Sequence, residues 1–321
     1  MLYLNADQVR TCLPMTAAIN TARKAFIALS DGSALVPPRI HITIGNSDSA
    51  LFMPAYLPDQ AQFAVKVVAM NAGNKERGLP LINALVLVHD TTTGAPLAIM
   101  DGRGLTAIRT GAASGLATDL LARQNAQTAA IFGAGAQSRT QLEAVCAVRP
   151  IEAAYIFDPD DDLATQFIDE MTLLLGIDIR AGTTTDLARA DVICTATTAE
   201  TPVFDAAHVS PGAHINGVGS YKPHMQELPG QLLVNARLFT DSTSVSITET
   251  GDLKIPLEQG LITIDDIAEI GELAAGQVQG RTTANELTIF KSVGNAVQDL
   301  SAAGLVIEKA RELGVGLELE D

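Results

Sequence analysis

Basic residues and long apolar runs are both scarce in this chain. Lysine and arginine number 21 against 37 acidic residues, so the formal net charge is −16. That balance argues against nucleic acid or an anionic membrane as a partner, because both need a positively charged face. The apolar run at Leu81–Val88 is far shorter than the roughly 20 residues of a membrane span. The opening residues MLYLNADQVR lack a signal pattern, so a cytoplasmic protein is expected.

Cysteine is also rare, and its spacing excludes a metal site. Cys12, Cys146 and Cys194 are odd in number and far apart, so they match neither a disulfide framework nor zinc-ligand spacing. We expect small buried thiols in a reducing compartment, and no metal. With 321 residues, 47% of them hydrophobic, the chain has room for two domains.

Residues 127–158 follow the order strand, glycine-rich turn, helix, strand and acid that a dinucleotide-binding βαβ unit requires. In the turn, Gly133 lets the chain reverse tightly and Gly135 leaves room for a pyrophosphate. The helix that follows would direct free N–H groups and its positive dipole end at the phosphates. Ser138 replaces the usual third glycine, which weakens the match, and an ordinary glycine turn is the alternative. The predicted cofactor contacts are Gly133, Gly135, Ala136 and Gln137.

An acidic run closes this unit. Asp158 comes 20 residues after Ser138, where a carboxylate accepts hydrogen bonds from the adenosine ribose. Asp160, Asp161 and Asp162 follow, and a 2′-phosphate would meet their negative charge. The sequence therefore favours NADH over NADPH as cofactor, although these acids also suit the start of the next helix.

The N-terminal third of the chain has strand patterns that do not belong to the dinucleotide fold. In RIHITI (39–44) the isoleucines alternate with Arg39 and His41, so we expect the isoleucines to face the core and the basic residues to face solvent or a cleft. Lys66 alternates with apolar residues in FAVKVVAMN. Such a lysine is either desolvated, as a reactive group or an anion anchor, or lies on an edge strand and reaches water.

A helical pattern rich in small residues follows at 106–122. Arg109 lies near its N-terminal end, where free N–H groups could help it bind a carboxylate. A structural ion pair is the alternative for Arg109.

Beyond residue 160, short apolar runs alternate with helical patterns, which predicts a doubly wound parallel sheet of the Rossmann type. Ligands bind outside the carboxyl ends of such strands. The cofactor contacts predicted at these ends are Thr195, Ala196, Thr197, Val218 and Gly219. From Asn285 onward we expect one long amphipathic helix that ends near Gly314.

Several segments together resemble the ornithine cyclodeaminase/μ-crystallin family. They are VPPRIHI (36–42), FAVKVV (63–68), GLTAIRTGAASGLATDLLA (104–122), IFGAGAQS (131–138), HINGVGSYKPHMQELP (214–229) and TIFKSVGNAVQDLSAA (288–303). They follow the family's order over nearly the whole chain. The resemblance implies a homodimer with an α+β substrate-binding and dimerisation domain, residues 1–118 plus 296–321. A Rossmann domain, residues 119–295, is inserted in it.

The resemblance also implies roles for individual residues. Arg39, Lys66 and Arg109 match the family's substrate-binding positions, with the arginines on the substrate carboxylate. Lys66 would lie beside that carboxylate and the reacting carbon, so Lys66 and Arg109 are the expected catalytic residues. Three cations recognise an anion, and their field favours hydride delivery to a C=N carbon.

Three further cofactor contacts are expected from the same comparison. Lys291 and Ser292 resemble the family segment near the nicotinamide ribose. The alternative is that this segment is only a helix start with a close-packed glycine. Thr110 follows the carboxylate-binding Arg109 and is the third expected contact.

The segment GVGSYKPHMQELP departs from the cyclodeaminase pattern. Ornithine cyclodeaminases have an aspartate just after the glycines, which orients the distal amine, whereas this chain has Ser220, Tyr221 and Lys222. The segment looks more like the branch that reduces the cyclic ketimines Δ1-pyrroline-2-carboxylate and Δ1-piperideine-2-carboxylate to proline and pipecolate. Ornithine cyclodeaminase, alanine dehydrogenase and a μ-crystallin-like binding protein stay as alternatives. His224 is a candidate proton donor or an ordinary loop residue.

Overall fold

The computed structural model describes residues 1–45 and 48–320, and the chain divides into two compact units. Unit 1 comprises Met1–Arg109 and the residues from Asn295 onward, and unit 2 comprises Thr110–Gly294. Helix α3 (Gly102–Leu121) carries the first boundary. The units therefore part between Arg109 and Thr110, rather than between residues 118 and 119 as the sequence suggested.

Unit 1 is built on a mostly antiparallel sheet. In the described part of the chain this sheet has seven strands in the order β15-β1-β6-β5-β4-β3-β2. Only the β1–β6 pair among them is parallel. The strands are β1 (Leu2–Leu4), β2 (Ile40–Ile44), β3 (Asp48–Leu57), β4 (Gln62–Met70), β5 (Ile82–Asp90), β6 (Pro96–Asp101) and β15 (Leu317–Glu318), with short turns of 3-10 helix at η1 (Pro58–Gln60) and η2 (Ala72–Arg77).

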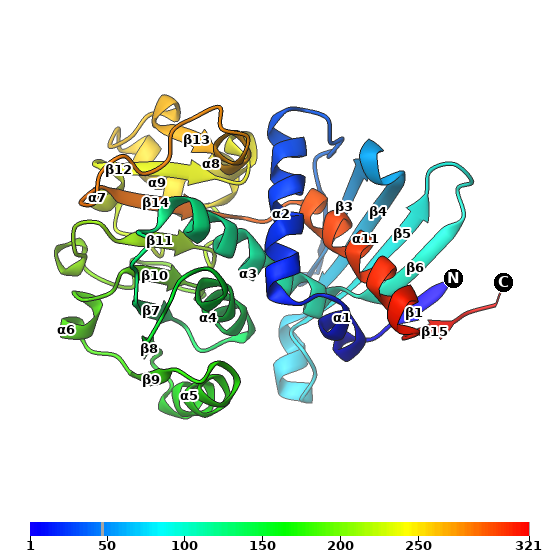
Figure 1. Cartoon of the computed structure of the whole chain (residues 1–321), viewed down its shortest axis with the longest axis horizontal. Coiled ribbons are helices and arrows are strands. Elements are labelled where there is room, and N and C mark those ends of the chain that lie inside the picture. Colours follow the sequence, from blue (N-terminus) through cyan, green and yellow to red (C-terminus); the bar gives the residue numbers. More distant parts are fainter. Residues whose placement is uncertain (46–47, 321) are drawn as a thin grey trace. The chain divides into compact units, whose positions relative to one another are not determined.

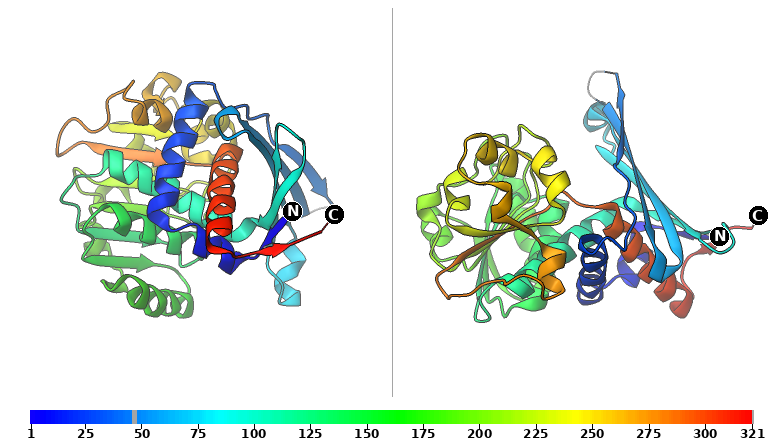
Figure 2. Two further views of the ribbon diagram at one scale, coloured as in Figure 1. Left: turned by 45° about the vertical axis from the view of Figure 1, so that its right-hand side comes forward. Right: turned by 90° about the horizontal axis from the view of Figure 1, so that it is seen from above.

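The helices of unit 1 gather on one face of this sheet (Figure 2, right). Helix α11 (Ala296–Leu313) lies across β3 and β4, and helices α1 (Ala6–Cys12) and α2 (Met15–Ser30) pack against α11. Asn295 caps α11, and Gly314 ends it with a φ of 64°. This face buries Met53, Ala64 and Val86, so it holds the core of the unit.

The isoleucines of β2 lie on the opposite, uncovered face of the sheet. Ile40, Ile42 and Ile44 are 59%, 46% and 50% exposed. Because β2 pairs His41 with Leu51, and β3 pairs Met53 with Lys66, the side chains of His41 and Lys66 point to the same side. The prediction that the isoleucines face the core is therefore wrong, although their grouping on one face was correct.

Unit 2 is a doubly wound parallel sheet (Figure 1). Over the described residues the sheet has eight strands in the order β13-β12-β14-β11-β10-β7-β8-β9, all parallel. The strands are β7 (Thr128–Phe132), β8 (Ala153–Phe157), β9 (Asp178–Ala181), β10 (Val192–Thr195), β11 (His214–Gly217), β12 (Ala236–Thr240), β13 (Ile267–Glu269) and β14 (Leu287–Lys291).

Helices cover both faces of this sheet and enclose two apolar cores. On one face α4 and α5 supply Leu142 and Phe167, and on the other α6 and α9 supply Leu187 and Leu253. The helices after α3 are α4 (Ala136–Val148), α5 (Asp161–Leu175), α6 (Thr184–Leu187), α7 (Gly230–Leu233), α8 (Thr243–Glu249), α9 (Gly251–Glu258) and α10 (Ile270–Ala274), with 3-10 turns at η3 (Ala206–His208) and η4 (Ile264–Asp266).

The long helix expected from Asn285 is two elements. The run LTIFK forms the inner strand β14, which pairs with both β11 and β12 and is buried on both faces. Gly294, at a φ of 78°, then turns the chain before the cap at Asn295. A short run buried on both faces has no two-residue alternation, and this is why it blended into the helical pattern that follows.

Candidate active site

Lys66 is buried and paired with a carboxylate that the sequence did not single out. The side chain of Lys66 is 2% exposed, and Nζ lies 2.7 Å from Oδ2 of Asp299 on helix α11 and 3.5 Å from Oγ1 of Thr106 on α3. Burial lowers the pKa of Lys66 to about 8, against the opposing charge of Asp299. Lys66 is therefore desolvated, and it does not lie on an edge strand with its ammonium in water.

Arg109 meets the same carboxylate from helix α3. Its Nε donates to Oδ1 of Asp299 at 2.9 Å, and its Nη1 donates to Oε1 of Gln298 at 3.2 Å. Among the described residues, Nη2 of Arg109 has no hydrogen-bond partner. The guanidinium is thus held by two groups, while one edge can still bind a carboxylate.

Arg39 completes this group, which we call the cation cluster: Lys66 and Arg109, which share Asp299, together with Arg39, whose charge acts on Lys66. Arg39 directly precedes β2 and is half-buried, and its positive charge contributes to the lowered pKa of Lys66. Burial raises the pKa of Asp299, but the charges of Arg109 and Lys66 outweigh it, so this pKa is lowered. Lys66 and Arg109 bring two positive charges to the single carboxylate of Asp299, so this site inside unit 1 is net positive and attracts an anion.

In unit 2 the glycine turn has the form that a pyrophosphate needs. Gly133 has a φ of 93°, and a Cβ there would lie 2.8 Å from the carbonyl oxygen of Ala196. Gly135 is the N-cap of α4 with no side-chain cap, and a Cβ there would meet nothing within 4 Å. Gly135 and Ala136 are exposed, and no side chain caps the first N–H groups of α4. These residues fit a dinucleotide phosphate bound at a helix N-terminus.

Asp158 follows β8 and lies against this turn. Its Oδ2 accepts the N–H of Ala134 at 2.6 Å, and its Oδ1 accepts the N–H of Asp160 at 2.9 Å. Asp160 in turn caps α5, so the acidic run does start a helix, as its sequence suggested. The carboxylate of Asp158 is oriented by backbone and keeps lone pairs for ribose hydroxyls.

The loops after β10 and β11 are joined by a second buried acid, Glu227, which the sequence analysis also missed. Glu227 accepts hydrogen bonds from Thr195 Oγ1, Thr197 N, Gly219 N and Ser220 N at 2.6–3.0 Å. Burial raises the pKa of Glu227, and the charge of Lys291 opposes the rise. Four of its neighbours belong to the strand ends from which cofactor contacts were predicted. The backbone at Ala196 and Val218 is fixed by bonds to Phe132 and Thr195.

Lys291 has its side chain inside unit 2. It is fully buried, with Nζ 2.8 Å from Oδ2 of Asp252, and Asp252 Oδ1 accepts the N–H groups of Glu227 and Leu228. The ammonium thus supports the loop that carries Glu227. A contact between Lys291 and a nicotinamide ribose stays a prediction. Because the side chain is paired with Asp252, only the backbone of Lys291 could make this contact.

The next residues are held by Asp241, at the carboxyl end of β12. Its Oδ2 accepts Ser292 Oγ at 2.9 Å, Val293 N at 3.1 Å and Gly294 N at 2.7 Å. Ser292 and Thr110 are both buried, and their expected cofactor contacts also stay predictions. By contrast, Tyr221, Lys222 and His224 are exposed, with His224 Nε2 3.7 Å from Glu200 Oε1.

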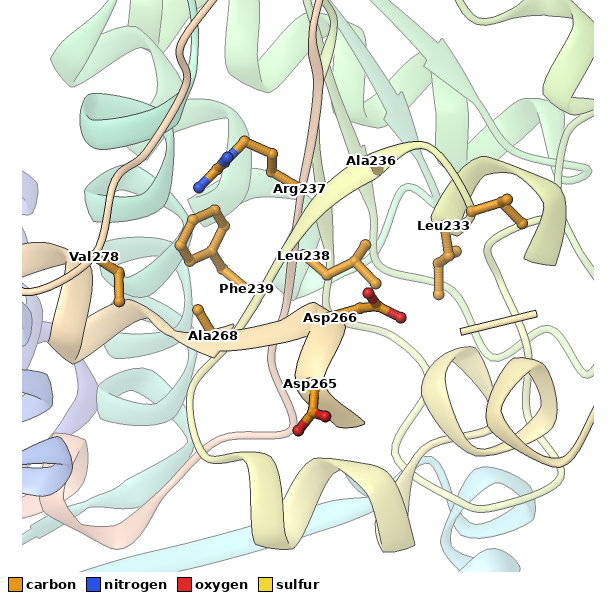
Figure 3. A pocket seen from close by; sticks show the side chains of 10 residues that line it. Leu233, Ala236, Arg237, Leu238, Phe239, Asp265, Asp266, Ala268 and Val278 are labelled. Atoms are coloured by element: carbon orange, nitrogen blue, oxygen red, sulfur yellow. The ribbon is translucent and has the colours of Figure 1, made fainter. Parts of the chain in front are cut away.

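A pocket of about 310 Å³ lies elsewhere in unit 2, along β12 and β13 (Figure 3). It is lined by Arg237, Asp265, Asp266 and apolar neighbours, and it contains none of the residues predicted to bind substrate or cofactor. Within the described residues there is no group of three or more His, Cys, Asp or Glu placed to hold a metal ion. The helices described are all too short or too polar to cross a bilayer.

Comparison with known proteins identifies the family. The model of the ornithine cyclodeaminase/mu-crystallin family matches residues 2–314. The chain belongs to this family. It is 39% identical to a Δ1-pyrroline-2-carboxylate reductase of Bacillus cereus, with both chains covered completely.

Two solved structures extend this likeness to the fold. The Thermococcus litoralis Δ1-pyrroline-2-carboxylate reductase in complex with NADH and L-proline is 41% identical, with a TM-score of 0.94 over 99% of this chain and 100% of that one. An archaeal alanine dehydrogenase dimer with bound NAD is 33% identical, with a TM-score of 0.93 over 100% and 99% of the two chains.

Proposed function

We propose that this chain reduces Δ1-pyrroline-2-carboxylate to L-proline, and Δ1-piperideine-2-carboxylate to L-pipecolate, using NADH. The observation that carries the proposal is the cation cluster: Lys66 and Arg109 share one buried carboxylate and leave a positive site for one further anion. The substrate brings one carboxylate, one C=N bond and an apolar ring. Full-length likeness to reductases of this substrate supports the same reaction.

The residues of the cluster divide the substrate between them. Arg109, through Nη2, and Arg39 bind the substrate carboxylate, which fixes the ring in the site. Lys66 lies beside the imine, where its positive charge stabilises the negative charge that develops on nitrogen. NADH, when bound, supplies the hydride that adds to C2. No acid is required for a distal amine, in agreement with Tyr221 and Lys222 where cyclodeaminases have an aspartate.

NADH is the proposed cofactor in preference to NADPH. Asp158 directly follows β8 beside the glycine turn, and its carboxylate accepts the N–H of Ala134. A 2′-phosphate at this point would face the negative charges of Asp158 and of the acids that follow it. NADPH binding would therefore be weakened by this repulsion as well as by loss of the hydrogen bonds to the ribose hydroxyl.

We further propose a homodimer formed through the uncovered face of the unit 1 sheet. That face carries the exposed isoleucines of β2 together with Phe63 and Leu85, which are 40% and 46% exposed. An apolar face of this extent is typical of a subunit interface. A cytoplasmic location agrees with three free thiols, at Cys12, Cys146 and Cys194.

The test follows NADH oxidation by absorbance, first with the cyclic imine and then with pyruvate plus ammonia. A separate assay measures ammonia release from ornithine. Turnover of the cyclic imine above that of pyruvate plus ammonia supports the reductase. The reverse order supports alanine dehydrogenase, the second candidate, which the likeness to the archaeal alanine dehydrogenase favours. Ammonia from ornithine would support a cyclodeaminase, and tight NADH binding without any turnover a μ-crystallin-like binding protein.

A further inference from the structure

The proposed reaction needs a proton as well as a hydride. The hydride from NADH adds to C2, the electron pair of the C=N bond moves to nitrogen, and nitrogen takes up one proton. The cation cluster contains one group that can give a proton near neutral pH, because the pKa of Lys66 is lowered to about 8. After transfer Lys66 is a neutral amine, and solvent returns its proton.

We infer that Asp299 is a positioning residue of this site, whose carboxylate sets Lys66 and Arg109 side by side and keeps Lys66 in the ammonium form that protonates the imine. This inference rests on the proposed function. Asp299 is 1% exposed and lies 2.7 Å from Lys66 Nζ and 2.9 Å from Arg109 Nε, one oxygen to each cation. A single carboxylate thus fixes both the proton donor and the carboxylate anchor.

The N-terminal cap of α11 holds the backbone of Asp299 in place. It lies in the first turn of α11, where Asn295 Oδ1 accepts the N–H of Val297 and Gln298 Oε1 accepts the N–H of Asn295. A carboxylate in the first turn is also favoured by the helix dipole. Gln298 Oε1 also accepts a hydrogen bond from Arg109 Nη1. Gln298 therefore belongs both to the cap of α11 and to the surroundings of the cation cluster.

The charges that act on Lys66 have opposite effects. Among the described residues, Asp299 on α11 favours the ammonium, whereas Arg109 on α3 and Arg39 before β2 disfavour it, as does burial. The other neighbours are the hydroxyl of Thr106 on α3 and, from β3 and β5, the apolar Met53 and Val86. Asp299 is therefore the group that opposes deprotonation of Lys66 in this buried position.

Two nearly isosteric substitutions test the inference in opposite directions. Asp299→Asn removes the charge and should move the alkaline limb of the pH profile of kcat/KM down from about pH 8. A shift of at least about one pH unit is expected for the loss of an opposite charge at this distance. Gln298→Glu adds a carboxylate beside Arg109 and should move the limb to higher pH. Ser301→Ala, at a buried hydroxyl on the same helix that bonds Gln60 and Thr21, is the matched control and should lower stability without moving the limb.

The same comparison is made without turnover by NMR. The wild type and both variants are labelled with ¹⁵N at lysine Nζ, and the Lys66 signal is assigned by its loss in Lys66→Met. A Lys66 pKa that falls in Asp299→Asn and rises in Gln298→Glu supports the inference. If Asp299→Asn does not fold, Gln298→Glu alone decides.

An unchanged Lys66 titration in the folded variants would overturn the role of Asp299, even with a fully active reductase. Failure of the wild type to reduce any cyclic imine would instead overturn the proposed function, and the titration would still report on Asp299.

Discussion

At the scale of single residues, each unit contains a group of buried charges among its described residues. Lys66 and Arg109 share Asp299 in unit 1, and Lys291 pairs with Asp252 next to Glu227 in unit 2. Buried ions of this kind cost desolvation energy and are kept where they position something. In unit 1 the excess charge is positive, which suits recognition of a carboxylate.

Arg109→Lys tests the carboxylate anchor. Lysine keeps the charge but loses the planar fork, so one of the hydrogen bonds to Asp299, Gln298 or substrate must be lost. We expect KM for the cyclic imine to rise roughly 10- to 100-fold, the value of a charge-assisted hydrogen bond. Arg103→Lys is the control, because Arg103 lies on the same helix with an exposed side chain paired to Asp101. Equal KM in wild type and Arg109→Lys would contradict the assignment.

Asp158→Asn tests cofactor choice. The amide keeps the size of the side chain but cannot repel a phosphate or accept with full charge. The ratio of kcat/KM for NADH to that for NADPH should fall about tenfold. Asp178→Asn serves as control, since Asp178 begins β9 and lies at the amino ends of the strands, whereas Asp158 lies at the carboxyl end of β8. A ratio that stays the same would show that Asp158 does not select the cofactor.

Residue patterns predicted the cations and the glycine turn but not their partners. Lys66 and Arg109 stand out because a charge within an apolar or small-residue run is unusual. Asp299 sits in AVQDLSAA, where it reads as a polar position on an ordinary helix, and 190 residues separate it from Arg109. Glu227 likewise follows a loop and carries no pattern. Such pairings depend on the tertiary fold, which one sequence does not display.

At the scale of elements, the strand ends of unit 2 are organised by Glu227. Four donors from the segments after β10 and β11 converge on its carboxylate. Gly219 is required there, because a Cβ would lie 2.3 Å from the carbonyl oxygen of Thr197. The two loops therefore behave as one piece.

Glu227→Gln should loosen that piece. The amide presents N–H groups to N–H donors, so at least one buried donor is left unpaired. We expect the dissociation constant for NADH, measured by fluorescence, to rise about tenfold. Glu200→Gln, an exposed acid after β10, provides the comparison. A variant that binds NADH as tightly as the wild type would mean that Glu227 does not support the cofactor site.

Strand β11 carries a buried histidine whose ionisation should limit acid stability. His214 is bonded to Thr288 Oγ1 and Asn216 Oδ1, and burial lowers its pKa from 6.5 to about 3. Below pH 6.5 the unfolded chain binds a proton that the folded chain refuses, so stability falls as pH drops toward 3. At pH 5 this costs about 2 kcal/mol.

Denaturant unfolding at pH 7 and pH 5 measures this effect. The loss of unfolding free energy between the two pH values should be smaller in His214→Gln by about 2 kcal/mol. His208→Gln, a half-buried histidine in η3, should lose as much as the wild type. If His214→Gln also lost as much, the histidine would not be the group that titrates.

Element types were read well from sequence where one face is buried and less well elsewhere. The glycine turn, α4 and β8 follow one another within residues 127–158 in the predicted order. The residues of strand β14 were included in a predicted helix, because both faces of the strand are buried and a helical pattern follows it. The side of β2 was misassigned because its isoleucines, at 59%, 46% and 50% exposure, lie on the uncovered face. Apolar character alone does not distinguish a core from an interface.

At the scale of the whole molecule, that uncovered face predicts self-association. Ile42→Glu places a charge on the face and should yield a monomer by light scattering after gel filtration, whereas we expect a dimer for the wild type. Leu173→Glu is the control, because Leu173 is 89% exposed on α5 in unit 2. A wild-type monomer, or an Ile42→Glu dimer, would contradict the proposed interface.

Hydride delivery from NADH to a cyclic imino acid is the proposed activity of this chain. The most direct measurement is the initial rate of NADH oxidation by the purified protein with Δ1-pyrroline-2-carboxylate, repeated with NADPH and with L-proline formation quantified. For this activity we expect rapid oxidation of NADH, slower oxidation of NADPH and one proline formed per NADH oxidised. No oxidation with either cofactor would contradict it.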